Sequence, residues 1–148
     1  MNNSPRDSLD FSDSQLEQIS DDALLEVLPE NTNEDNATKY VLIKHDYYST
    51  DSEHGREILS GFLTNLAASS YSSIVIYLID SGVRLLDKEN SLYGKMKYLI
   101  ERSKTVIATD ESIELYNICI PMTLKIGIES IISVTEDIAY LDNLLILE

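Results

Sequence analysis

The residues best suited to chemistry in this sequence are three aspartates, Asp46, Asp80 and Asp110, each of which follows an apolar run typical of a buried strand. Parallel strands present their carboxyl ends along one edge of a sheet, so the three carboxylates are expected on a common rim. Converging carboxylates offer the oxygen ligands that a hard cation such as magnesium prefers. An aspartate in this position also commonly caps the following helix. The capping role is the simpler interpretation, and it implies neither a metal nor a cofactor.

The turn after Asp80 adds further candidate groups for ligand binding. Gly82 would let the backbone approach a ligand, and Arg84 would pair with an anion, although a glycine here also serves simply to turn the chain. The sequence contains neither a GxGxxG motif nor a Walker loop, so phosphate binding by a glycine-rich turn is not indicated. The predicted ligand rim therefore comprises these residues: Asp46, Asp80, Ser81, Gly82, Arg84, Thr109 and Asp110.

Candidate nucleophiles and bases are few: Cys119, Ser112 and His45. Isoleucines flank Cys119 on both sides, which favours a buried and unreactive thiol. Ser112 follows two acidic residues, which do not activate a hydroxyl, and His45 stands at a strand end, where proton chemistry is feasible. These residues do not assemble a catalytic triad, and one cysteine with two distant histidines cannot form a zinc site. The sequence thus favours a protein that is not an enzyme.

The elements that must position these residues alternate along the chain from residue 40 onward. Compact apolar runs predict strands over residues 40–45, 73–79, 105–108 and 144–147. Helical spacing predicts helices over residues 53–68, 90–103, 111–118 and 134–140, and residues 124–128 form either a fourth strand or an extended loop. Alternating strands and helices predict an α/β fold in which helices cover both faces of a parallel sheet.

The composition restricts the class of partner and the cellular setting. The chain has 148 residues, is 43% hydrophobic and 25% charged, and carries a net charge of −15. This charge disfavours binding to nucleic acid or to an anionic membrane. No apolar run approaches the roughly 20 residues that cross a bilayer, and the first residues lack the apolar core of a secretory signal. We therefore expect a cytoplasmic protein.

The first 39 residues differ from the rest in charge. They contain ten acidic and two basic residues, a net charge of −8. A capping box at Ser12 and apolar residues at helical spacing predict a short amphipathic helix over about residues 13–28, followed by a flexible polar linker. This helix either packs on its own domain or docks on a protein partner. The predicted organisation is an acidic segment, 1–39, and a folded domain, 40–148.

The order of several short motifs resembles the DsrE/DsrF-like family, and most closely the C-terminal domain of sulfurtransferase-like selenium-metabolism proteins of the YedF type. The resemblance covers about three quarters of the chain and rests on Val41-Leu42-Ile43 before Asp46, Asp51–Gly55, Ile79–Leu85, Leu115–Ile118, Lys125–Gly127 and Asp142 before the last strand. It implies a three-layer α/β/α domain with a mainly parallel five-stranded sheet, assembly into homo-oligomers and a place in sulfur or selenium handling. Nine tyrosines agree with an expected oligomer.

The sequence also departs from this family at the residue that would carry sulfur. Relatives usually have a cysteine after the third strand, whereas this chain has Thr109 and Ser112 at the matching places. A hydroxyl of ordinary pKa cannot replace a thiolate as an acceptor of sulfane sulfur. The resemblance therefore implies a non-catalytic binding or assembly module. The alternative is a sulfurtransferase or persulfide carrier that acts through Cys119.

Overall fold

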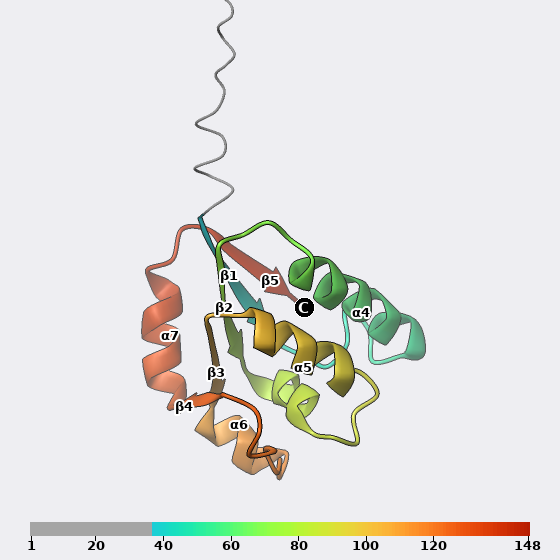
Figure 1. The fold of residues 1–148 in the computed structure, drawn as a ribbon. Helices are drawn as coiled ribbons and strands as arrows, with labels where there is room; N and C mark the ends of the chain where they lie inside the picture. The colour runs from blue at the N-terminus through green and yellow to red at the C-terminus, as the bar shows by residue number, and fades with distance from the viewer. Residues whose placement is uncertain (1–36) are drawn as a thin grey trace, which may run out of the picture. The chain divides into compact units, whose positions relative to one another are not determined.

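The computed structural model describes residues 37–148, so the helix predicted over residues 13–28 lies outside the described residues. In the described part, five strands form one parallel sheet in the order β4-β3-β2-β1-β5 (Figure 1). The strands are β1 (Thr38–Ile43), β2 (Ser73–Leu78), β3 (Thr105–Thr109), β4 (Gly127–Glu129) and β5 (Leu144–Leu147). The predicted α/β class and the parallel five-stranded sheet are confirmed.

Helices cover both faces of this sheet. Helices α4 (Glu53–Ala67) and α5 (Tyr93–Arg102) lie on one face, and α7 (Ile131–Ala139) lies on the other (Figure 1). The larger core contains Leu59 and Leu63 of α4 with Met96 and Leu99 of α5. The smaller core places Val134 of α7 among strand residues of the opposite face. The domain therefore has three layers, α/β/α.

The sequence of β2 explains why it occupies the middle of the sheet. Ile74, Ile76 and Leu78 contribute to the larger core, while Tyr77 belongs to the smaller core on the opposite face. Burial on both faces accounts for the continuous apolar run, in contrast to the alternation seen in half-exposed strands. The adjacent α4 begins where the Ser52 side chain accepts a hydrogen bond from the backbone N–H of Gly55.

Several elements differ in detail from the sequence prediction. Strand β1 lies two residues earlier than predicted, α5 begins three residues later and α7 begins three residues earlier. The uncertain segment 124–128 contains only a three-residue strand, β4, and α6 (Asp110–Leu115) ends three residues before its predicted end. Residues 80–86, for which no helix was expected, form the 3-10 helix η1 (Asp80–Leu86). No helix in the described part of the chain is long and apolar enough to span a membrane.

Candidate functional site

The carboxyl edge of the sheet is shaped by the close approach of η1 to the end of β1. Gly82 is buried, and its backbone N–H donates to the Lys44 carbonyl at 3.2 Å. A Cβ atom at this position would lie 2.5 Å from the backbone oxygen of Ile43. The close approach that Gly82 permits here is between η1 and the backbone of β1. The space that the missing side chain leaves is filled by β1, and the contact brings Asp80 near His45.

Asp80 is the centre of the resulting hydrogen-bond network. Its backbone lies in the left-handed region, with φ of 50°, and its N–H donates to Ser112 Oγ at 2.8 Å. Its Oδ1 accepts a hydrogen bond from the Tyr116 hydroxyl at 2.8 Å, and its Oδ2 lies 3.9 Å from His45 Nδ1. The Asp80 side chain is 51% exposed. A carboxylate that is positioned by two side chains and by its own backbone, yet is open to solvent, is well placed to bind a partner.

Asp80 also changes the acidity of its tyrosine partner. The pKa of Tyr116 is raised, chiefly because its hydroxyl donates to the Asp80 carboxylate, which stabilises the protonated phenol. The phenol therefore remains a hydrogen-bond donor to Asp80 throughout the neutral range.

The hydroxyls of Thr109 and Ser112 form the buried side of this network. Thr109 is fully buried and donates to Ser112 Oγ at 2.7 Å, and Ser112 is 8% exposed. Ser112 Oγ accepts this bond together with the one from the Asp80 N–H. Ser112 is therefore a buried positioning residue, and the structure does not present it as an open nucleophile.

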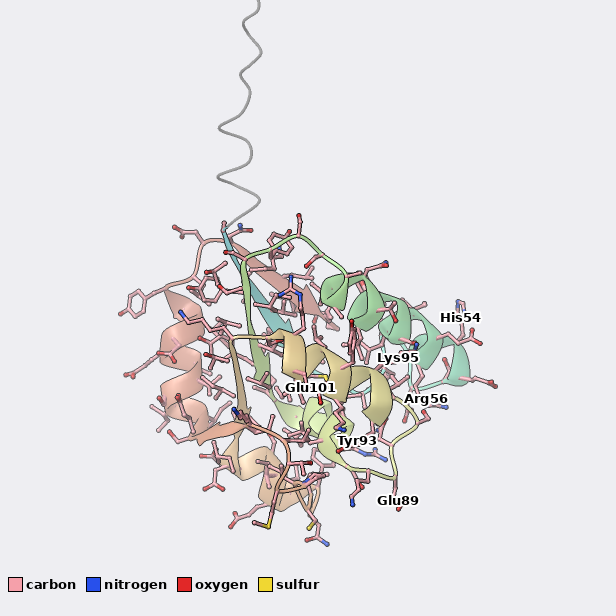
Figure 2. All side chains as sticks on the ribbon, viewed as in Figure 1. His54, Arg56, Glu89, Tyr93, Lys95 and Glu101 are labelled. Carbon is pink, nitrogen blue, oxygen red and sulfur yellow. The ribbon has the colours of Figure 1, made fainter. Side chains whose placement is uncertain are left out.

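His45 lies beside Asp80 at the edge of the site. Its ring is 24% exposed, stacks on Tyr47 with ring centroids 4.8 Å apart, and places Nδ1 3.0 Å from Ser81 Oγ. Ser81 is itself buried. Ser81 and Asp80 both face Nδ1, whereas a catalytic triad needs serine and carboxylate on opposite ring nitrogens. The other histidine, His54, projects from the outer side of α4, away from this site (Figure 2).

Asp46 and Arg84 form a second, partly buried pair next to this network. Asp46 is 7% exposed and accepts from Asn90 Nδ2 at 3.1 Å, and the same oxygen lies 3.7 Å from Arg84 Nε. The anion that Arg84 was expected to bind is thus, in this structure, the Asp46 carboxylate. A cavity of about 110 Å³ lies beside Arg84 and Asn90. This volume is well below the roughly 300 Å³ at which small-molecule pockets begin, so the site is essentially an open surface.

The three aspartates of the predicted rim do not converge on a common point. Asp46 is buried against Asn90 and Arg84, Asp80 bonds Tyr116, and Asp110 is an exposed residue in the first turn of α6. Thr109, and not Asp110, occupies the N-cap position of that helix. Among residues 37–148, no group of three His, Cys, Asp or Glu side chains could hold a metal ion. The magnesium alternative therefore lacks a site within this part of the chain.

The prediction of a buried Cys119 is wrong, because its thiol is exposed. Ile118 and Ile120 are partly buried and pack on the larger core. In an extended segment, alternate side chains point in opposite directions, so the residue between two inward isoleucines faces solvent. The inward direction of the two flanking isoleucines therefore turns the Cys119 side chain toward solvent.

Sequence reasoning missed three residues of the site: Tyr47, Asn90 and Tyr116. The hydrogen bond from Tyr116 to Asp80 spans 36 positions, and that from Asn90 to Asp46 spans 44. No local pattern indicates such pairs. Only Tyr47, two residues after His45, had a possible signal, since adjacent aromatic and imidazole rings at the end of a strand can stack.

The fold is similar to that of two proteins of known structure. A conserved protein of unknown function from Bacteroides thetaiotaomicron superposes with a TM-score of 0.54 and 18% identity, over 74% of this chain and 95% of that chain. The ychN protein of E. coli gives a TM-score of 0.51 and 11% identity, over 74% of this chain and 99% of that chain. No protein-family model and no curated protein sequence matches. Both neighbours have the DsrE/DsrF-like fold, and the described domain shares it.

Proposed function

We propose that this chain is a non-catalytic binding module in sulfur or selenium handling, and that it recognises a protein or peptide carrier at the carboxyl edge of its sheet. The observation that carries the proposal is the state of Thr109 and Ser112, the residues that stand where sulfur-carrying relatives have cysteine. Both hydroxyls are buried and bonded to each other, and Ser112 holds the Asp80 backbone. Thr109 and Ser112 therefore hold Asp80 in place from inside the domain and do not carry a reacting group.

The exposed part of the site offers groups for recognition. The half-exposed Asp80 carboxylate, the Tyr116 phenol, the stacked His45 and Tyr47 rings and the half-exposed Arg84 guanidinium lie along one edge. They combine acceptors, donors and flat apolar rings, the mixture typical of protein-binding surfaces. The bordering cavity of about 110 Å³ is too small to enclose a carrier, so recognition takes place on the open surface.

A second candidate function is persulfide transfer through Cys119, and the exposure of its thiol favours it. In this reaction the Cys119 thiolate attacks the outer sulfur of a donor persulfide. The donor S–S bond breaks, the donor leaves as a thiolate, and Cys119 becomes a persulfide. The mass of the chain then rises by about 32 Da per sulfur.

One experiment separates the two functions. The ¹⁵N-labelled full chain is incubated with glutathione persulfide, and the intact mass and the amide spectrum are recorded together. A binding module shows shifted amides at His45, Asp80 and Tyr116 and no gain in mass. A carrier gains about 32 Da, and the gain disappears in Cys119→Ser. Neither shift nor mass gain would contradict both functions for this class of carrier.

The Tyr116→Phe variant is the matched control for the binding function. It removes only the hydroxyl that bonds Asp80, on a side chain that lies at the surface of the domain. If glutathione persulfide binds at this edge, the variant weakens the amide shifts at Asp80 while the spectrum elsewhere stays unchanged. Equal shifts in the variant and the wild type would show that the edge is not the binding surface.

A further inference from the structure

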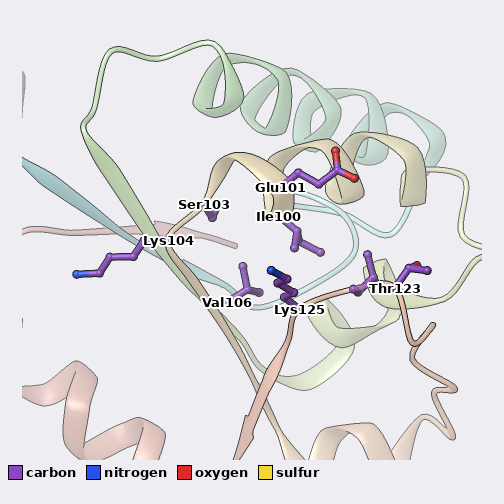
Figure 3. Close-up of a pocket in the computed structure, with 8 residues that line it drawn as sticks. Ile100, Glu101, Ser103, Lys104, Val106, Thr123 and Lys125 are labelled. Carbon is purple, nitrogen blue, oxygen red and sulfur yellow. The ribbon is translucent and has the colours of Figure 1, made fainter.

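A second candidate site lies at the opposite end of β3, away from the carboxyl edge. A cavity of about 380 Å³ opens between the end of α5, the start of β3 and the loop before β4 (Figure 3). Its volume falls within the range of about 300–1,000 Å³ that small-molecule sites occupy. Nothing in the function proposed above uses this cavity.

The topology explains why the cavity exists. Helices α4 and α5 cover β1 to β3 on this face, but the connection from β3 to β4 supplies only the six-residue α6 and then an irregular segment. Ile118, Ile120, Leu124 and Ile126 of that segment contribute to the larger core in place of a helix. An extended chain is narrower than a helix of about 10 Å diameter, so space remains between it and α5.

The cavity has an apolar floor and a polar mouth. Ile100, Val106 and Leu124 form the floor, and each is less than 10% exposed. The mouth contains these polar residues: Glu101, Ser103, Lys104, Thr123 and Lys125. The Ser103 hydroxyl donates to the Leu99 carbonyl at 2.7 Å, so its oxygen keeps a free lone pair. Such a site favours a ligand with an apolar body and a charged or polar head.

The two lysines of the mouth differ in direction. In Figure 3 the Lys125 amine lies toward Ile100 and Val106, whereas the Lys104 amine extends away from the other lining residues. Neither lysine forms an ion pair with another described residue. Glu101 lies near Lys97, with 3.9 Å between Nζ and Oε2, which offsets its negative charge at the mouth. An ammonium group above an apolar floor is complementary to a carboxylate that carries an aliphatic chain.

We propose that this cavity binds a small aliphatic carboxylate, with the chain on Ile100, Val106 and Leu124 and the carboxylate on Lys125. The site is separate from the carboxyl edge, because Val106 lies near the amino end of β3 and Thr109 ends that strand. Binding here is therefore independent of the function proposed for Asp80 and Tyr116.

The test is a titration of the ¹⁵N-labelled full chain with hexanoate, followed by amide shifts. Saturable shifts are expected at residues 100–106 and 123–125, with the amides of His45, Asp80 and Tyr116 unchanged. Extending the chain from butanoate to hexanoate buries further CH₂ groups, and each should tighten binding by up to about fourfold. Hexanol, which has no charge, and acetate, which has no chain, should each bind more weakly.

Two matched variants decide the role of the ammonium group. Lys125→Gln should weaken hexanoate by about five- to tenfold and leave hexanol unchanged. Lys104→Gln, which removes the same charge from the neighbouring outward lysine, should leave hexanoate binding within about twofold. Equal losses of hexanoate affinity in the two variants would show that only the net charge of the surface matters, and would overturn the assignment of the carboxylate to Lys125. Shifts spread equally over exposed apolar residues such as Met122 and Tyr140 would show nonspecific contact and would refute the site.

Discussion

The packing of η1 on β1 predicts that Gly82→Ala is strongly destabilising. The backbone of Gly82 has no positive φ, so conformational preference is not the reason. The reason is space, because an added Cβ would lie 2.5 Å from the Ile43 oxygen and 3.2 Å from the Ile43 carbonyl carbon. Both are backbone atoms at the end of a central strand, and they cannot rotate away as a side chain can. The helix must therefore shift, or β1 must.

The size of the effect follows from two terms. Overpacking a filled site costs about 1–3 kcal/mol. A displacement of η1 also weakens the hydrogen bond from the Gly82 N–H to Lys44, which contributes about 1 kcal/mol. The free energy of unfolding should fall by about 2–4 kcal/mol.

Urea denaturation of the full chain, followed by circular dichroism, measures this loss. Gly61→Ala is the matched control, since at that exposed position in α4 an added Cβ would meet no atom within 4 Å apart from the backbone of its own helix. An alanine there should stabilise the helix by about 0.5–1 kcal/mol. Both substitutions replace glycine with alanine, yet the expected changes in the free energy of unfolding have opposite signs. If Gly82→Ala were as stable as the wild type, the packing of η1 on β1 would be incorrect.

Four further predictions concern the site and the assembly. The pKa of Tyr116 is raised above 10.0, so its hydrogen bond to Asp80 stabilises the fold fully below pH 10.0 and is lost as the pH rises through the raised pKa. In an absorbance titration of the tyrosines, Asp80→Asn should lower the pKa of Tyr116. An unchanged titration would show that the hydrogen bond is absent. The exposed Cys119 thiol should react with a disulfide reagent in the native chain, and Cys119→Ser should change the free energy of unfolding by less than about 0.5 kcal/mol; a thiol that reacts only after unfolding would contradict its exposure. A chain that begins at Ala37 should unfold cooperatively near the midpoint of the full chain, because residues 38–148 contain both described cores, and a large loss of stability would show that the removed segment belongs to the fold. Light scattering should give a molar mass of at least twice the 16.7 kDa of one chain at both low and high salt, because salt screens charge repulsion between subunits and leaves apolar burial intact. A monomer at both salt concentrations would exclude the expected oligomer.

The pattern of side chains was sufficient to predict the class of fold. The apolar runs at 73–79 and 105–108 and the helical spacing of 53–68 are local features, and each appears in the structure within one residue of its predicted ends. Such elements are predictable because burial on one or both faces imposes a period that neighbouring residues share. The same reasoning missed η1, because a short 3-10 helix has no distinctive period and depends on tertiary packing.

The sequence by itself therefore determined the alternation of strands and helices and the order of the aspartates along the chain. Only the tertiary structure decided that Asp80 is the shared centre, since its partners Ser112 and Tyr116 lie 32 and 36 positions away. It also decided that Asp46 is buried beside Arg84 and that Cys119 faces solvent. The physical reason is that hydrogen bonds and burial at a sheet edge depend on which strand ends meet, and local sequence does not encode those contacts.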